Sequence, residues 1–372
     1  MKILQTPVRF YPYIGGTEQV ALYLGKELVN RGHAVSVICA NEPRACAPNV
    51  SGVNVKRLDY VAKVANTNIT PALLSEILKQ DFDLLHTYLP HPWSADISAI
   101  ASRIKKKPLF LTYCNDITGS GINQFIAGCY NRVFLPGLLK TARKIFIINK
   151  NYIESSPFLK KFSEKVVFLP LGVDLEKFKP IPVEKEEAPR VFFMAKLDNF
   201  HRYKGLEYLL SAVKELKSKI PIKLYVGGQG ELLGFYKAFV KEHGLEGSVD
   251  FLGFLSDEEL VRFYNLCDCF VLPSVSSVQE GFGLVAVEAM ACKKPVIVTE
   301  VIGTAEEIKS HNAGIVVKSR DISDLASALE SILINKEKAG VMGENGYRLV
   351  LEKYTWQKQA DIIEKEYIEA IK

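Results

Sequence analysis

Hydrophobic and polar positions follow two rhythms along almost the whole chain. Short, nearly continuous apolar runs, typical of buried strands, alternate with longer stretches in which apolar residues recur every three or four positions, as in amphipathic helices. Strands that alternate with helices indicate parallel sheets covered by helices, the α/β class. We expect strands at 2–4, 34–39, 83–86, 109–113, 144–148 and 166–169 in the first half, and at 190–194, 223–226, 250–252, 269–272 and 295–298 in the second.

The alternation stops once and then restarts, which indicates two domains. A proline-rich, charged segment at 177–189 separates the halves and has the composition of a linker. The length of 372 residues also exceeds what one hydrophobic core usually serves. We expect two doubly wound domains facing a cleft, 1–175 and 176–372, with a last helix at about 355–372 that could pack on either. Ligands of such sheets bind at the carboxyl ends of the strands.

One segment of the second half has the composition of an anion site. Gly281 and Gly283 let backbone N–H groups approach a ligand closely, and the apolar helix that follows offers its positive end to phosphate. Glu280 lies in the loop before this helix, where its carboxylate could face a ligand. Glu288 lies within the apolar run 284–290 and needs a partner, for which a sugar hydroxyl is suitable. Phosphate and hydroxyl sites together point to a nucleotide sugar.

Two other interpretations of this segment remain open from the residues alone. A glutamate at a helix start is often only a partner of the helix dipole, and a glutamate within a helix usually faces solvent. The segment also fits a loose dinucleotide-binding pattern, which requires its first glycine to follow a strand immediately. The preceding apolar run ends at Pro273, eight residues before Gly281, so hydride transfer is disfavoured.

Basic residues and glycines elsewhere fit the same ligand. Lys196 and Lys204 follow the first strand of the second half, where they could stabilise a departing diphosphate, and Arg202 could replace either. Gly16 in the first half and Gly228 in the second follow strands in loops that tolerate phosphate. Solvated lysines and ordinary glycine turns are the alternatives.

We expect no metal ion and no cofactor. Two aspartates at Asp81 and Asp83 have the spacing of metal-dependent transferases, but they lead straight into a buried strand. We expect one of them to end a helix and the other to face solvent. The lysines and the helix end would then neutralise the diphosphate.

The net charge of +5 is unevenly distributed. Residues 1–175 carry 21 basic and 12 acidic side chains, and residues 176–372 carry 26 and 30. The basic excess is either a solvated face or an attraction to an anionic membrane surface or an acceptor phosphate. No recognition motif for nucleic acid accompanies it.

The remaining composition predicts a cytoplasmic protein. No apolar run reaches membrane-spanning length, and the chain begins directly in a strand without a signal sequence. Seven cysteines are scattered without paired spacing, which indicates reduced thiols and no zinc site. If the protein touches the inner membrane face peripherally, the side chains expected there are Phe134, Leu135, Leu138 and Leu139.

Taken together, the motifs resemble those of the retaining glycosyltransferases of family 4, the glycogen-synthase-like and mannosyltransferase-like branch of the GT-B fold. The resemblance extends over essentially the whole chain. Its most specific feature is Glu280 followed, after seven intervening residues, by Glu288. The other features are Gly15-Gly16, His86, Pro90-His91-Pro92, Pro170–Asp174, Lys204-Gly205, Gly228–Gly230, Phe251–Gly253 and Leu272–Ser274.

The resemblance implies a role for each donor-side residue. Glu280 would contact the hydroxyls of the donor sugar, and Glu288 the ribose of the nucleotide. The backbone amides of Phe282, Gly283 and Leu284 would hold the diphosphate.

On the same basis, Lys204 would assist at the diphosphate, and Lys196 would act where the family usually has an arginine. Gly16 would let the acceptor domain approach the donor. The resemblance thus implies transfer of a hexose from a UDP- or GDP-sugar to a glycan, lipid or lipid-linked acceptor.

The chain departs from the family pattern after the strand at 109–113. The family commonly has a histidine there, near the anomeric carbon of the donor, whereas this chain has Cys114. A thiol has neither the hydrogen-bond geometry nor the charge of an imidazole. Either the backbone suffices at this point, or Asn115, Asp116 or His86 substitutes, or the activity is weakened. An NDP-sugar epimerase and a sugar-nucleotide-binding protein without turnover therefore remain alternatives.

Overall fold

The computed structural model describes residues 1–372 except 45–46, 65, 118–121, 151, 185–187 and 278. Its contacts divide the chain into two compact units. The first unit comprises Met1–Leu171 and Trp356–Lys372, and the second comprises Gly172–Thr355. The last helix, which the sequence could assign to either half, thus belongs to the first unit.

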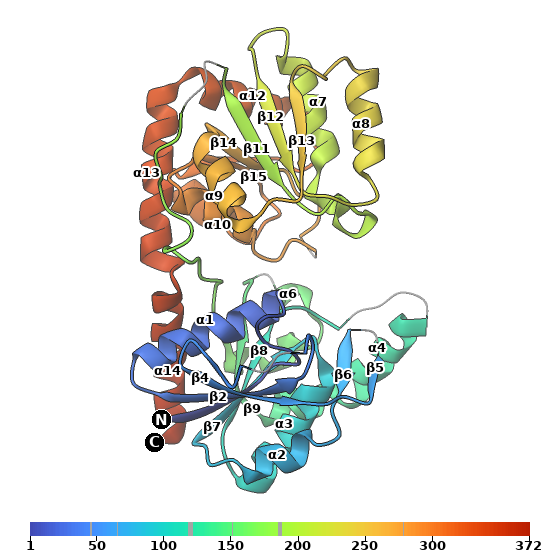
Figure 1. Cartoon of the computed structure of the whole chain (residues 1–372), viewed down its shortest axis with the longest axis vertical. Coiled ribbons are helices and arrows are strands. Elements are labelled where there is room, and N and C mark those ends of the chain that lie inside the picture. The colour runs from blue at the N-terminus through green and yellow to red at the C-terminus, as the bar shows by residue number, and fades with distance from the viewer. Residues whose placement is uncertain (45–46, 65, 118–121, 151, 185–187, 278) are drawn as a thin grey trace. The chain divides into compact units, whose positions relative to one another are not determined.

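An eight-stranded sheet forms the centre of the first unit (Figure 1). Its order is β10-β9-β8-β7-β1-β2-β4-β3, and all neighbours are parallel except β3 and β4. A separate antiparallel pair, β5 and β6, lies beside it. The bounds are β1 Lys2–Thr6, β2 Ala34–Ala40, β3 Asn49–Val50, β4 Val53–Leu58, β5 Ala62–Val64, β6 Thr67–Ile69, β7 Leu84–Leu89, β8 Leu109–Tyr113, β9 Ala142–Ile147 and β10 Val166–Phe168.

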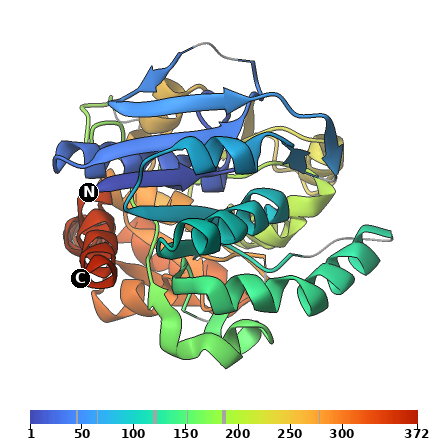
Figure 2. The same cartoon turned by 90° about the horizontal axis from the view of Figure 1, so that it is seen from below.

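Helices cover both faces of this sheet, because successive strand residues point to opposite sides. Ile3 packs in the core beneath α1 (Gly16–Asn30) and α14 (Trp356–Ile371), while Leu4 packs in the core on the side of α2, α3 and α5. The N- and C-terminal ends lie side by side in both views (Figures 1 and 2). The other helices are α2 Leu73–Lys79, α3 Pro92–Lys105, α4 Ile122–Val133, α5 Leu135–Thr141, α6 Tyr152–Ser155 and the 3₁₀ segment η1 Leu159–Lys165.

The second unit contains a six-stranded, fully parallel sheet in the order β13-β12-β11-β14-β15-β16. On β11, Val191 and Phe193 pack toward α7 and α12, while Phe192 stacks on Phe263 of α9. The strands are β11 Arg190–Met194, β12 Lys223–Gly227, β13 Val249–Gly253, β14 Cys269–Leu272, β15 Val296–Thr299 and β16 Gly314–Val317. The helices are η2 Asn199–Lys204, α7 Leu206–Leu216, α8 Leu233–Glu242, α9 Asp257–Leu266, α10 Leu284–Ala291, α11 Ala305–Ser310, α12 Ile322–Ile334 and α13 Lys336–Lys353.

The α/β class with parallel, doubly wound sheets is confirmed. In each unit the chain crosses from one side of the parallel sheet to the other at one point, between β1 and β7 in the first and between β11 and β14 in the second. Such a switch point opens a crevice at the carboxyl ends of the strands, where ligands of these folds bind. Within the described residues no helix is both long enough and apolar enough to cross a bilayer.

The expected strands all form, and several others form that were not predicted. The largest of these is β4, in which buried and exposed residues alternate near the sheet edge, so it contains no continuous apolar run. The edge strand β16 and the short strands β3, β5 and β6 were also not predicted.

Candidate active site

The helix α10 begins directly after a glycine that a larger residue could not easily replace. Gly283 has a φ of +80°, and a Cβ at this position would lie 3.1 Å from the side chain of Ile302. The helix then runs from Leu284, and the first amides of any helix lack partners within it. Its positive end thus follows the loop that leaves the carboxyl end of β14, where it can bind an anion.

Glu280 and Lys204 form a buried ion pair in front of this helix. Lys204 Nζ lies 2.6 Å from Glu280 Oε2, and the two side chains are 15% and 6% exposed. Ser274 Oγ donates a hydrogen bond to the same carboxylate oxygen at 2.8 Å. The structure therefore brings together two of the predicted site residues. It also shows Ser274 as a partner of Glu280 that was not predicted.

The loops after β11 and β14 can meet here because of a second glycine. Gly205 follows Lys204 with a φ of +78°, and a Cβ on it would lie 2.0 Å from the carbonyl oxygen of Pro273. Only a residue without a side chain allows this approach. Lys204 is thereby held against the loop that carries Glu280.

Glu288 has a protein partner as well as an unusual pKa. Tyr264 on α9 donates its hydroxyl hydrogen to Glu288 Oε2 at 2.7 Å. Burial raises the pKa of Glu288 to about 7, although the Tyr264 hydrogen bond and the charge of Lys177 act against this rise. The expectation that this glutamate needs a partner is met within the protein, and its carboxyl group titrates near neutral pH.

The remaining predicted donor residues take different positions. Lys196 is exposed just beyond β11. Gly228 has a φ of +118°, and a Cβ on it would lie 1.7 Å from the carbonyl oxygen of Ala195, so it permits close packing of the loops after β11 and β12. Phe282 is buried in a T-shaped contact with Tyr354, so its side chain belongs to the core. Gly281 is half-buried between Glu280 and Phe282.

Arg202 is directed away from this group. Its Nε pairs with Glu207 of α7, and its guanidinium lies 5.5 Å from the centre of the Phe235 ring. The suggestion that Arg202 could replace one of the lysines does not fit these contacts.

A small cavity of about 260 Å³ lies at the switch point of the first unit, and we call it the polar cavity because charged and amide side chains are among those that line it. Its walls come from the segments that follow the carboxyl ends of β1, β7, β8 and β9. Of the residues predicted for the acceptor side, Cys114 and Asn115 line it, together with Gly16. The other lining residues are Arg9, Tyr13, Gly15, Thr17, Glu18, Val20, Asn66, Pro90, His91, Ile148 and Leu171.

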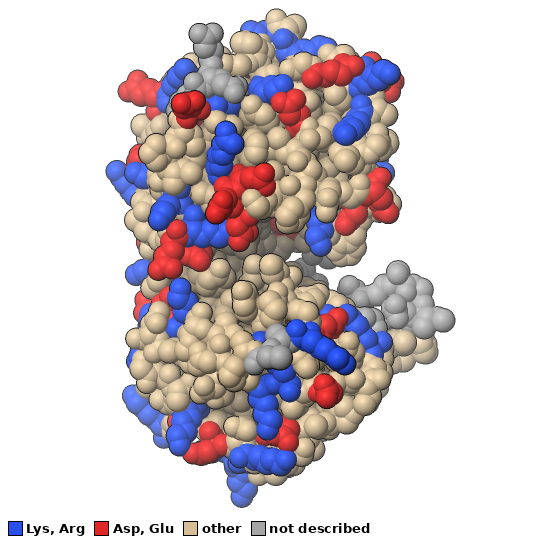
Figure 3. All heavy atoms as spheres, in the orientation of Figure 1, with Lys and Arg blue, Asp and Glu red and all other residues tan. Residues whose placement is uncertain are grey.

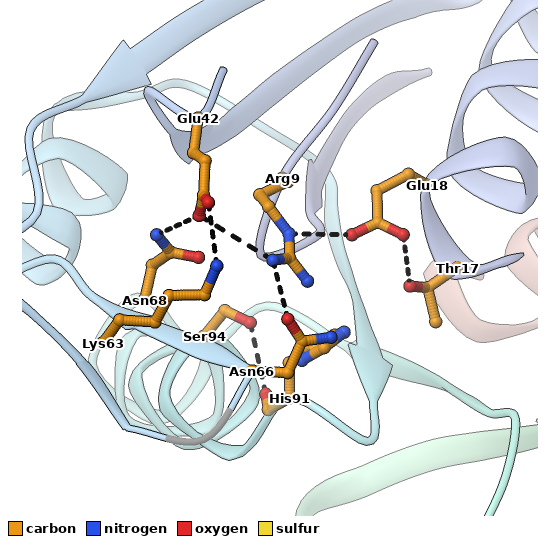
Figure 4. A network of polar contacts seen from close by, with 9 residues as sticks. All are labelled: Arg9, Thr17, Glu18, Glu42, Lys63, Asn66, Asn68, His91 and Ser94. Atoms are coloured by element: carbon orange, nitrogen blue, oxygen red, sulfur yellow. Dashed lines mark hydrogen bonds and ion pairs between the residues drawn. The ribbon is translucent and has the colours of Figure 1, made fainter. Parts of the chain in front are cut away.

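A buried ion pair that was not predicted from the sequence lies in this cavity wall (Figure 4). Arg9 Nε donates to Glu18 Oε1 at 3.2 Å, and the two side chains are 1% and 3% exposed. Arg9 Nη1 donates to Asn66 Oδ1 at 3.0 Å, and Thr17 Oγ1 donates to the other oxygen of Glu18 at 2.8 Å. Two features of the sequence could have indicated this pair. Arg9 lies between two apolar residues, and Glu18 is an acidic residue two positions after Gly16.

Cys114 lines the cavity as a protonated thiol. Burial raises its pKa to about 12. Its neighbour Asp116 is occupied elsewhere, because it accepts hydrogen bonds from Tyr113 Oη at 2.6 Å and Ser156 Oγ at 2.8 Å. Of the three residues after β8, Cys114 and Asn115 reach the polar cavity and Asp116 does not line it.

His86 does not substitute for the family histidine, contrary to one of our expectations. It is fully buried in β7, where it hydrogen bonds to Tyr367 of α14 and to Thr112 Oγ1. Burial lowers its pKa to about 3, so it is a neutral core residue. It points to the α14 side of the sheet rather than to the cavity.

Another histidine does reach the cavity. His91 precedes α3 and is 6% exposed. No described donor or acceptor lies within hydrogen-bonding distance of its Nδ1. Burial and the charge of Arg9 lower its pKa to about 4, so the ring is neutral near pH 7.

Two further sets of residues singled out in the sequence lie away from this cavity. Asp81 and Asp83 both contact Lys2, the first residue of β1, and so lie at the amino ends of the strands, opposite the cavity. Leu135, Leu138 and Leu139 are buried in the core of the first unit, and only Phe134 of the proposed membrane-contact residues is exposed. That expectation was wrong because the apolar face of α5 packs inward.

Comparison with known proteins agrees with this geometry. Residues 175–349 match the family Glycosyl transferases group 1, and residues 14–177 match Glycosyltransferase Family 4. The chain is 27% identical to the O-antigen chain mannosyltransferase C of Escherichia coli, over 97% of this chain and 96% of that protein. It is 25% identical to the phosphatidyl-myo-inositol mannosyltransferase of Mycolicibacterium smegmatis, over 92% and 87%.

A solved structure shares the fold over the full length. Anabaena HepE in complex with UDP superposes with a TM-score of 0.77 at 18% identity, over 99% of this chain and 100% of that one. The two family matches together extend over most of the chain. The two Rossmann-type sheets and the Glu280–Glu288 motif agree with them. The chain belongs to the GT4-type glycosyltransferases and has the GT-B fold.

Proposed function

We propose that this glycosyltransferase moves a hexose from a UDP- or GDP-sugar to a hydroxyl of a glycan, lipid or lipid-linked acceptor. In this proposal the configuration at the anomeric carbon is retained and no metal ion is needed. The observation that carries it is the buried Lys204–Glu280 pair in front of α10. At the switch point of the second sheet, this pair places a cation and a carboxylate close to the start of a helix.

Each part of this group has a distinct task toward the donor. The carboxylate of Glu280 is already fixed by Lys204 and Ser274, so it can accept hydrogen bonds from sugar hydroxyls without reorganising. Lys204 and the amides at the start of α10 stabilise negative charge on the diphosphate. One such donor contributes about 3 kcal/mol to the transition state.

The reaction is a displacement on one face of the sugar. The bond between the anomeric carbon and the diphosphate oxygen breaks while the acceptor oxygen bonds to the same carbon. The proton of the acceptor hydroxyl passes to the departing phosphate oxygen. Glu280 acts on the sugar hydroxyls in this scheme, so no covalent glycosyl-enzyme forms.

The names of similar proteins support the donor class. Two relatives that align over most of the chain are named mannosyltransferases, and HepE was crystallised with UDP. The charge excess of residues 1–175 is the only support for contact with a membrane surface. On the face of the first unit in Figure 3, acidic side chains lie among the basic ones. We therefore propose no contact with a membrane surface.

The test is thermal stabilisation by UDP, GDP, ADP and their sugar conjugates in the presence of EDTA. We expect one nucleotide to raise the melting temperature, and we expect Glu288→Ala to abolish the shift. Glu258→Ala is the matched control, because Glu258 is an exposed glutamate in the first turn of α9. No shift with any nucleotide in the wild-type protein would contradict the proposal, and a shift that needs a divalent ion would contradict its metal independence.

The pH dependence of this shift provides an internal check. Glu288 is mostly protonated at pH 6 and mostly ionised at pH 8, because its pKa is raised to about 7. Ribose hydroxyls donate to the ionised form, so nucleotide affinity should rise by about tenfold from pH 6 to pH 8. Glu288→Gln should flatten this profile. If the affinity falls over the same pH range instead, Glu288 does not accept a hydrogen bond from the ribose.

A further inference from the structure

A second, larger cavity on the first unit has an apolar wall. It encloses about 640 Å³, which lies within the range of small-molecule sites in proteins. It lies among α3, α4, the β5–β6 pair and the segment after β8. Its apolar surface comes mainly from Ile69, Trp93, Ile97, Ile100, Ile126 and Phe134.

Several of these side chains are left open to solvent. Ile100 is 42% exposed, Ile126 is 48% exposed and Phe134 is 60% exposed. Exposed apolar side chains that gather around one hollow mark a binding site more often than isolated ones do. An occupant with apolar groups would remove this surface from water.

The apolar cavity adjoins the polar cavity at the strand ends. Asn66, Pro90, His91 and Asn115 line both. The polar cavity contains the Arg9–Glu18 pair, and the shared border includes His91, whose Nδ1 has no partner among the described residues. The two cavities are therefore neighbours with a common border, and charged side chains line one of them while mostly apolar side chains line the other.

Most of the surface of the apolar cavity is apolar, and two of its polar side chains are paired with each other. Tyr130 donates a hydrogen bond to Asp96 Oδ1 at 3.0 Å. A sugar chain with hydroxyls along its length would find few partners there, whereas an alkyl or isoprenoid chain would need none.

We propose that the acceptor is an amphiphile whose hydroxyl-bearing head lies in the polar cavity and whose hydrocarbon chain fills the apolar one. This inference rests on the proposed function and narrows its acceptor class to lipids and lipid-linked glycans. Glu18 and His91 would meet the head, and the isoleucines of α3 and α4 would meet the chain. Because the two cavities share four lining residues, one occupant with a polar head and an apolar chain can contact both.

The test uses alkyl glucosides that differ only in chain length. Binding of methyl, n-hexyl and n-octyl β-D-glucopyranoside is measured by calorimetry below the critical micelle concentrations. Each buried methylene strengthens binding by about fourfold, so we expect the octyl compound to bind at least tenfold more tightly than the hexyl one. Equal affinities across the series, or no binding of the octyl compound, would overturn the proposal.

Paired variants locate the effect in the cavity. Ile100→Asn and Ile126→Asn change half-exposed residues of the cavity wall and should weaken octyl glucoside binding at least fivefold. Ile104→Asn on α3 and Phe125→Asn on α4 are the controls, since these residues are 58% and 76% exposed and do not line the cavity. Equal losses in all four would indicate general surface adhesion and overturn the assignment.

Nucleotide stabilisation of the same samples separates this inference from the proposed function. We expect all four variants to keep the wild-type nucleotide shift, because they lie on the first unit and the donor residues on the second. Loss of chain-length dependence with nucleotide binding intact would overturn only the lipid acceptor. An absent nucleotide shift in the wild-type protein would overturn the proposed function itself.

Discussion

The ion pair between Lys204 and Glu280 has two energetic roles at the level of single residues. Both side chains are nearly buried, so removing one partner leaves the other charge in a poorly solvated place. The same two groups are the ones that the proposal places on the diphosphate and the sugar. Stability and turnover must therefore be measured separately for any variant.

We predict that Lys204→Ala and Glu280→Ala each lower turnover at least about tenfold, equivalent to about 1.4 kcal/mol of the barrier. The measurement is the rate of nucleoside diphosphate release with a saturating donor, alongside circular dichroism to verify the fold. Arg202→Ala is the control from the same 3₁₀ segment, since Arg202 pairs with Glu207 instead. Near-native rates in either alanine variant would exclude that residue from the reaction.

The sequence predicted only part of the site at this scale. Glu280 and Glu288 lie within one short segment, so their spacing and the flanking glycines could be read directly. Their protein partners could not be predicted, because Tyr264 and Lys204 come from other elements and only the tertiary fold brings them near. The Arg9–Glu18 pair was missed because neither residue alone indicates burial.

At the level of elements, loops rather than strands assemble the donor side. Gly205 and Gly228 each have positive φ, and each lets its loop approach a carbonyl group of the neighbouring loop. The backbone of three consecutive strand ends is thus packed without intervening side chains. The geometry of Lys204 depends on this packing.

We predict that Gly228→Ala destabilises the protein by more than about 1 kcal/mol, because the added methyl group would collide with the Ala195 carbonyl at a φ that alanine rarely adopts. Gly340→Ala is the opposite control. Gly340 lies in α13 with open space where an added methyl group would project, so alanine there should stabilise the helix by up to about 1 kcal/mol. Urea denaturation measures both, and equal effects would contradict the steric argument.

Prediction from sequence was good for central elements and poor for edges. Strands buried on both faces contain continuous apolar runs, as in Cys269–Leu272. The strand β4 is exposed on alternate residues and resembles a loop when only apolar runs are counted. Whether a strand is central or at an edge depends on its position in the sheet, which the local sequence does not reveal.

At the level of the whole molecule, the last helix completes the first unit. Ile363 and Tyr367 of α14 are fully buried against the first sheet, and Tyr367 supplies the hydrogen-bond partner of His86. The preceding helix, α13, belongs to the second unit. The sequence alone left this assignment open, because an amphipathic helix shows that it packs but not against which partner.

We predict that Tyr367→Phe destabilises the first unit selectively, by about 1–3 kcal/mol, because a buried nitrogen of His86 loses its partner. Hydrogen exchange should rise in peptides of 1–171 and remain unchanged in those of 190–353. Tyr347→Phe on α13 is the control and should stay within about 0.5 kcal/mol of the wild type. Faster exchange in the second unit would show that α14 supports it too.

The return of the chain to its first unit also bears on how the protein is made. During synthesis, Met1–Leu171 leaves the ribosome first but lacks Trp356–Lys372, while Gly172–Thr355 contains its whole sheet and all its helices. Domains fold as units as they emerge. The second unit can therefore finish folding on the nascent chain. The part that is translated first must wait, with the α14-facing side of its sheet uncovered, until Trp356–Lys372 have also left the ribosome.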